Sequence, residues 1–144
     1  MAMTKSAQIE ALLRVGLFSE LSKRQLGHVA KVTYQSTYAA GDVVIKEQDT
    51  GHKLVLIVRG QAKVVRGGRR IASAGPGDAV GEIALIDGMP RSASVVAETP
   101  LETLLIFRTE FRKLLDEIPG LWEKLLLAQT ARLRAANREL AARG

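Results

Sequence analysis

Short extended segments separated by glycine-containing turns fill the middle of the chain. Apolar and polar residues alternate from Val32 to Tyr38, and residues 54–58 form a continuous apolar run of strand length. Gly67 and Gly68 separate two further extended segments, and both glycines can take the positive φ values of a two-residue hairpin turn. Many short strands at regular spacing favour a closed or double-sheet β architecture. The expected strands cover residues 32–38, 43–45, 54–58, 61–65, 69–74, 92–97 and 101–107.

Helical periodicity is found on both sides of this β region. Ser22 and Gln25 have the spacing of a capping box at the start of a helix. Thr109 is expected to cap another helix, which Pro119 and Gly120 interrupt. The expected helices cover residues 6–13, 22–32, 109–118 and 121–143.

The last expected helix carries one recurring seam of residues along its length. Its members follow one another at alternating steps of four and three, as in a coiled-coil face. They are Trp122, Leu126, Gln129, Leu133, Ala136 and Leu140. This face can lie on the β region, cover a ligand, or pair with a second copy of the chain.

Composition limits the classes of function. A chain of 144 residues fits one domain, and its lack of cysteine excludes disulfides and thiolate chemistry. The net charge of +6 is spread over scattered arginines and lysines, which is typical of a solvated surface. We therefore expect no nucleic-acid binding, and the aromatic share of 4% also argues against base stacking on single strands.

Metal, catalytic and membrane functions find no support in the sequence. His28 and His52 are the two histidines, and no set of metal ligands with a recognisable spacing surrounds them. No arrangement of nucleophile, base and acid is found, so we expect no enzyme activity. A secretory signal and an apolar run of about 20 residues are both missing, so we expect a cytoplasmic chain without membrane insertion.

The segment 81–95 combines the groups needed to hold a cyclic phosphate. Gly81 leads into a short apolar turn, and the first amides of such a turn point outward with partial positive charge. Arg91 offers a planar fork for two phosphate oxygens, and Ser92 adds a hydroxyl donor. Glu82 supplies a carboxylate that a phosphate would repel but a sugar hydroxyl would satisfy.

This segment resembles the phosphate-binding cassette of cyclic-nucleotide-binding domains. That family includes catabolite-activator-type regulators, regulatory subunits of cAMP-dependent protein kinase, and cyclic-nucleotide-gated channels. The similarity extends to Gly41-Asp42 with Glu47, to residues 54–60, and to Gly75-Pro76-Gly77-Asp78. Several spaced elements agree, which makes the signal stronger than that of one short motif.

The resemblance implies a fold that is mainly β with flanking helices. It is a double-stranded β-helix, or jelly-roll-like β-roll, with N-terminal helices, a short cassette helix, and C-terminal hinge and lid helices. We expect one domain over 1–144, with N-terminal helices in 1–31, the β-roll in 32–108 and C-terminal helices in 109–144. The cassette occupies 81–95, and Pro119-Gly120 is the expected hinge.

The resemblance also assigns site residues. Each group is expected to contact one part of the nucleotide or to cover it. The phosphate would contact Arg91, Ser92, Ala93, Ala84 and Ile83, and the ribose would contact Glu82 and Gly81. The base would pack on Val64, Ile71 and Ala72. The lid over the base would consist of Arg132, Leu133 and Ala136.

We therefore expect a cyclic-nucleotide sensor that transmits occupancy through its C-terminal helix to a protein partner or a fused effector. Ser92 favours cAMP over cGMP, since a threonine at this position often accompanies guanine recognition in the family. No metal is expected in the site. The alternatives are a ligand-free structural or dimerisation module of the same fold, with a homodimer through the C-terminal helix, and a fragment of a DNA-binding regulator.

Overall fold

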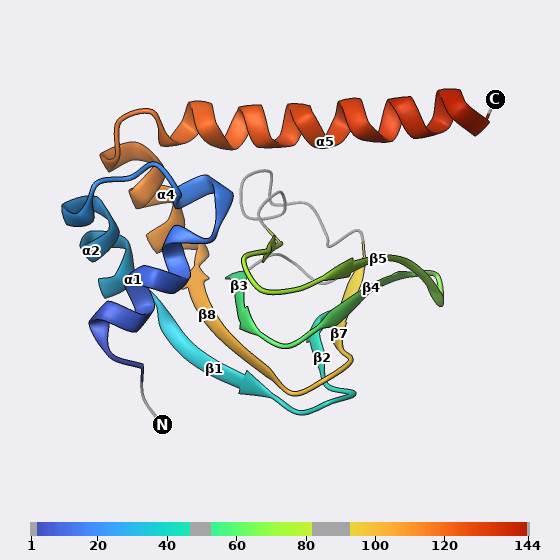
Figure 1. Ribbon diagram of the computed structural model, residues 1–144, viewed down its shortest axis with the longest axis horizontal. Helices are drawn as coiled ribbons and strands as arrows, with labels where there is room; N and C mark the ends of the chain where they lie inside the picture. The colour runs from blue at the N-terminus through green and yellow to red at the C-terminus, as the bar shows by residue number, and fades with distance from the viewer. Residues whose placement is uncertain (1–2, 47–52, 82–92, 144) are drawn as a thin grey trace.

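Two antiparallel four-stranded sheets form the centre of the molecule, and helices cover one side of it (Figure 1). The computed structural model describes residues 3–46, 53–81 and 93–143. One sheet has the strand order β1-β8-β3-β6 and the other has β2-β7-β4-β5. The strands are β1 (Tyr34–Tyr38), β2 (Val43–Ile45), β3 (Lys53–Arg59), β4 (Ala62–Arg66), β5 (Arg69–Ala74), β6 (Ala79–Val80), β7 (Ser94–Ala97) and β8 (Leu101–Phe107). The predicted β-roll is confirmed.

The central strands β3 and β8 are buried on both faces. Leu54 and Ile106 belong to a core shared with the helices, whereas Val55 and Leu105 belong to a second core shared with the other sheet. Successive side chains of a strand point to opposite faces, so the apolar run of β3 supplies both cores at once. This explains why residues 54–58 have no polar alternation.

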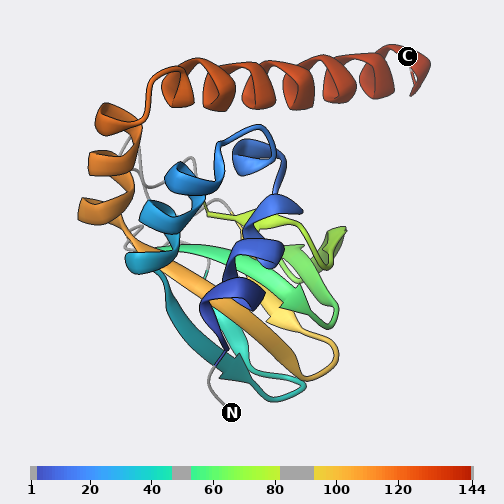
Figure 2. The same cartoon turned by 60° about the vertical axis from the view of Figure 1, so that its left-hand side comes forward.

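The N-terminal helices α1 (Lys5–Leu13) and α2 (Lys23–Lys31) pack on the outer face of the β1-β8-β3-β6 sheet (Figure 2). The predicted capping box of α2 is confirmed. The hydroxyl of Ser22 accepts a bond of 3.1 Å from the Gln25 amide, and the Ser22 amide donates to Gln25 Oε1 at 3.0 Å. A single 3₁₀ turn, η1 (Gly16–Phe18), follows α1 and buries Phe18 in the helical core.

The C-terminal helices are α4 (Arg108–Glu117) and α5 (Leu121–Arg143). The prediction that Thr109 caps α4 is wrong: Phe107 occupies the N-cap position and no side chain caps the helix. Because β8 passes directly into α4, Thr109 already lies within the first helical turn. The predicted break before α5 is confirmed, and Gly120 takes a φ of 82° there.

An aspartate side chain closes each of two turns in the β region. In both turns the carboxylate accepts a hydrogen bond from the backbone amide three residues earlier in the chain. Asp42 Oδ2 accepts from the Ala39 amide at 2.8 Å, and Asp78 Oδ2 accepts from the Gly75 amide at 2.8 Å. The hairpin between β4 and β5 turns at Gly67 and Gly68, whose φ values are 56° and 78°. The positive φ values predicted for this glycine pair are confirmed.

Candidate functional site

The cassette segment connects the two sheets. Gly81 directly follows β6, which pairs with β3 in one sheet, and Ala93 directly precedes β7, which pairs with β4 in the other. Gly81 has a φ of 94°, which side-chain-bearing residues rarely adopt. The remaining predicted phosphate and ribose residues lie outside the described residues. They are Glu82, Ile83, Ala84, Arg91 and Ser92.

Two of the three predicted base-contacting residues lie side by side on neighbouring strands. Val64 of β4 is directly opposite Ala72 of β5, and on its other side it is opposite Val95 of β7. Directly opposed residues of antiparallel strands point to the same face, so these three side chains form one row. Val64 packs on the second core, which contains the buried Val95. Val64 and Val95 therefore face the second core, whereas Ala72, on the edge strand β5, is exposed.

Ile71, the third predicted residue, lies in a β-bulge. The pairing passes from Val64↔Ala72 to Val65↔Arg70, which leaves Ile71 as the extra residue. Its side chain is 49% exposed. A bulge re-aims the side chain that it displaces, and here it holds an apolar side chain in an accessible position. The structure thus places all three predicted residues in one hairpin, with Ile71 and Ala72 both exposed on β5.

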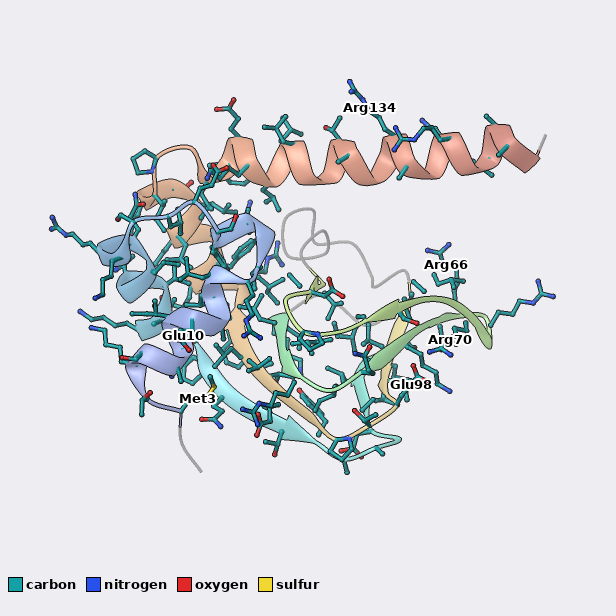
Figure 3. The ribbon with its side chains drawn as sticks, in the orientation of Figure 1. Met3, Glu10, Arg66, Arg70, Glu98 and Arg134 are labelled. Carbon is teal, nitrogen blue, oxygen red and sulfur yellow. The ribbon has the colours of Figure 1, made fainter. Side chains whose placement is uncertain are left out.

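Charged side chains surround the same hairpin. Arg70 Nη2 donates to Ser73 Oγ at 3.2 Å and forms an ion pair with Glu98. Figure 3 shows Arg66 on the side of the hairpin that faces α5, and Arg70 with Glu98 on the opposite side. The cationic hairpin is thus partly neutralised on its outer face.

The predicted lid residues Arg132, Leu133 and Ala136 lie within α5, but the structure does not describe their side chains. Figure 3 shows Arg134 directed away from the sheets. Leu121 and Leu125 are buried at the start of α5, whereas Leu126 and Leu140 are largely exposed. Among the described side chains of α5, those buried against the body therefore lie in its first two turns.

A hydrogen bond and an ion pair join the C-terminal helices to α2 and to the segment just before it, and sequence reasoning missed both. His28 Nε2 lies 2.8 Å from Glu117 Oε2, and Lys124 Nζ lies 2.6 Å from Glu20 Oε2. The hydrogen bond and the positive charge of Lys124 lower the pKa of the Glu20 carboxyl. These partners are 89 and 104 residues apart, so no local pattern could identify them.

Within the described ranges, no group of three or more histidine, aspartate or glutamate side chains is arranged to hold a metal ion. A search of the same residues finds no helix with the length and apolar character needed to cross a membrane.

A family model described as "Cyclic nucleotide-binding domain" matches residues 35–118. The chain belongs to the cyclic nucleotide-binding domain family. The matched range runs from β1 to the residue that ends α4, so the family match contains the cassette segment and the β4–β5 hairpin. The N-terminal helices and α5 lie outside it.

Relatives of this cyclic nucleotide-binding domain are regulatory proteins by name. The chain is 32% identical to a "cAMP-dependent protein kinase regulatory subunit" of Hypocrea atroviridis over 110 residues, which are 76% of this chain and 24% of that protein. It is 32% identical to a "Cyclic AMP receptor protein" of Thermus thermophilus over 129 residues, 86% of this chain and 60% of that protein. The chain thus spans less than two thirds of either curated relative.

A solved structure resembles the fold over nearly the whole chain. The cyclic nucleotide-binding domain from Methylobacillus flagellatus has a TM-score of 0.79 at 30% sequence identity, with 97% of this chain and 84% of that chain covered. The similarity therefore includes α5 as well as the β-roll.

Proposed function

We propose that this domain binds a cyclic nucleotide between its cassette and its β4–β5 hairpin and reports the occupancy of that site to another protein or to a fused effector. The observation that carries this proposal is the family match across the segment that joins β6 to β7. The cassette offers Arg91 and backbone amides to an anionic group, and its last residue, Val95, belongs to the apolar row with Val64 and Ala72, which suits a ligand with an anionic end and an aromatic end.

The cassette residues have separate roles in this proposal. Arg91 pairs with two phosphate oxygens, and the Ser92 hydroxyl donates to the same group. The backbone amides of Ile83, Ala84 and Ala93 complete the phosphate site. Glu82 accepts a hydrogen bond from the ribose 2′-hydroxyl, and Gly81 lets the sugar approach the backbone closely. Val64, Ile71 and Ala72 form the wall for the base.

We propose cAMP as the preferred ligand. Both curated relatives described above are named for cyclic AMP, and Ser92 stands where threonine often accompanies guanine recognition in the family. Competition between cAMP and cGMP for the purified protein tests this preference directly. Tighter binding of cGMP would reverse the assignment.

Isothermal titration with cAMP tests the proposed site. Arg91→Ala should weaken binding by about 10- to 100-fold, because a charge-assisted pair to phosphate is lost. Arg24→Ala is the matched control, since Arg24 is an exposed arginine of α2 and the charge change is the same. Equal affinities of the two variants would remove Arg91 from the site, and a wild-type protein that binds neither nucleotide would refute the proposed function.

A reporting role requires an element that moves, and we propose α5 for it. Gly120, just before α5, has the backbone freedom of a hinge, and no described side chain of α5 after Leu125 is buried. On binding, the helix would cover the base with Arg132, Leu133 or Ala136. We place this module in the reducing cytoplasm, in keeping with a chain that contains no cysteine.

A structural or dimerisation module is the second candidate. Trp122, Leu126 and Leu140 of the predicted seam are 41%, 67% and 63% exposed, so these three positions are accessible to a second copy. Thermal unfolding separates the two candidates. A ligand at about 100 times its Kd should stabilise a receptor by about 2.7 kcal/mol, whereas a purely structural module would show no shift.

A further inference from the structure

Strand β5 forms one edge of the β2-β7-β4-β5 sheet. Among the described strands it pairs with β4 alone, and all of its residues from 69 to 73 are exposed. Figure 1 shows the β4–β5 hairpin projecting beyond the other strands of the roll. An edge strand presents backbone N–H and C=O groups with which a further strand can pair. The edge of β5 is therefore a surface on which an extended polypeptide segment can dock.

The same hairpin is strongly cationic. Residues 62–74 contain four basic side chains and no acidic one. Arg66 and Arg69 lie directly opposite one another on the two strands, so their side chains point to the same face, where like charges repel. Arg70 pairs with Glu98, whereas Arg69 forms no ion pair with any acidic residue that the structure describes. A carboxylate brought to Arg69 from outside would therefore reduce the repulsion at this end of the hairpin.

We propose that the edge of β5 docks an acidic, extended segment of a partner protein. Backbone pairing along the strand provides the attachment, and the exposed Arg69 favours a segment that carries glutamate or aspartate. A second copy of this hairpin fits poorly, because it brings further arginines and no carboxylate to place beside Arg69.

Two observations favour a polypeptide over a nucleic acid at this edge. A phosphate backbone has no amide groups that could pair with a strand, so it would leave the edge of β5 unused. The cations are also gathered at one hairpin, whereas the affinity of a nucleic acid grows with the number of phosphates that the protein contacts. An acidic strand uses both the open edge and the charge.

Fluorescence anisotropy with a short labelled peptide of alternating glutamate and threonine tests the docking. The titration uses the whole chain without nucleotide, so its outcome is independent of the proposed function. The chain should bind this peptide, and added salt should weaken the binding because charges contribute to it. A peptide of alternating lysine and threonine should not bind. Failure of the glutamate peptide to bind at millimolar concentration, or equal binding of the two peptides, would overturn the proposal.

A charge reversal locates the contact on the hairpin. Arg69→Glu should weaken binding of the glutamate peptide about tenfold, because attraction is replaced by repulsion. Arg24→Glu is the matched control, since Arg24 is an exposed arginine of α2 and the change of charge is the same. This control should keep the affinity of the wild type. An equal loss in both variants would mean that the peptide responds only to net charge, which contradicts a site at β5.

Hydrogen exchange of the wild-type protein identifies the edge without any substitution. The glutamate peptide at saturation should slow the exchange of backbone amides in β5, because both sides of this strand are then hydrogen-bonded. Strand β2, at the opposite edge of the same sheet, is the control and should exchange as before. Unchanged exchange in β5, or equal protection of β2, would contradict the proposal. A DNA duplex that displaces the peptide and protects β5 more strongly would show that the partner is a nucleic acid instead.

Discussion

Ile71 keeps 49% of its side chain exposed although it belongs to a strand. Because it is the bulged residue, its truncation leaves no cavity in either core. We expect Ile71→Ala to change the free energy of unfolding by less than about 0.5 kcal/mol. The same change should weaken cAMP binding about threefold to tenfold, since apolar contact with the base is lost. Chemical denaturation and titration calorimetry measure the two effects separately.

Val43→Ala is the control for this residue. Val43 lies in β2 and is 55% exposed, so the truncation removes a similar amount of accessible apolar surface away from the hairpin. Its affinity should equal that of the wild type. A loss of affinity as large as that of Ile71→Ala would show that Ile71 has no specific place in the base site.

The role of a residue could be predicted from the sequence where its interaction partner is close in the chain. Ser22 and Gln25 satisfy each other within three residues, so their spacing was sufficient to identify the capping box. Thr109 has a common capping residue type, but its role depended on where β8 ends, which the sequence does not mark. The pairing of Val64 with Ala72 required the register of a bulged hairpin, so the sequence alone placed them near one another only through the family resemblance.

At the scale of elements, we expect that α5 can be shortened without loss of the core. Among the described side chains of this helix, Leu121 and Leu125 belong to the buried helical core. A chain that ends at Leu126 should therefore keep a cooperative unfolding transition, but its affinity for cAMP should fall about tenfold, or 1.4 kcal/mol, because the base loses its cover. Thermal unfolding and calorimetry of the shortened chain measure both quantities. Unchanged affinity of the shortened chain itself would exclude α5 as a cover for the ligand.

Elements with a strong local pattern matched their expected bounds. The segment 101–107 and the helix 121–143 begin and end as predicted, because proline and glycine precede them and their apolar periodicity is clear. Strand β6 was not predicted, since two residues are too few to show a period and its pairing with Val55 and Leu56 of β3 is a tertiary contact. The cassette helix lies outside the described residues, so this expected element remains a prediction.

At the scale of the whole molecule, an ion pair and a hydrogen bond connect the N-terminal and C-terminal helical regions. Lys124 reaches Glu20, and Glu117 reaches His28. The long separation of these partners in sequence leaves no trace in composition or periodicity. The fold class was therefore predictable from the sequence, whereas the contacts that orient the helices on the sheets were not.

The Lys124–Glu20 pair makes stability depend on pH in a known direction. Lys124 lowers the pKa of the folded Glu20 carboxyl below its unfolded value, so the folded state favours the ionised form. The stabilisation is complete above the ordinary glutamate pKa of about 4.3 and is lost as the pH falls through the lower folded value. The urea midpoint of the wild type should thus exceed that of Glu20→Gln at pH 7, and the difference should shrink at acidic pH.

Glu10→Gln is the control that separates the effect of the Lys124–Glu20 pair from the loss of one glutamate. Glu10 is exposed on α1 (Figure 3) and has no ion-pair partner among the described residues. Glu10→Gln removes the same charge as Glu20→Gln but breaks no described ion pair, so a pH dependence that is lost in Glu20→Gln and kept in Glu10→Gln belongs to the contact with Lys124. Identical pH dependence of the two variants would mean that Lys124 adds nothing to folding through Glu20.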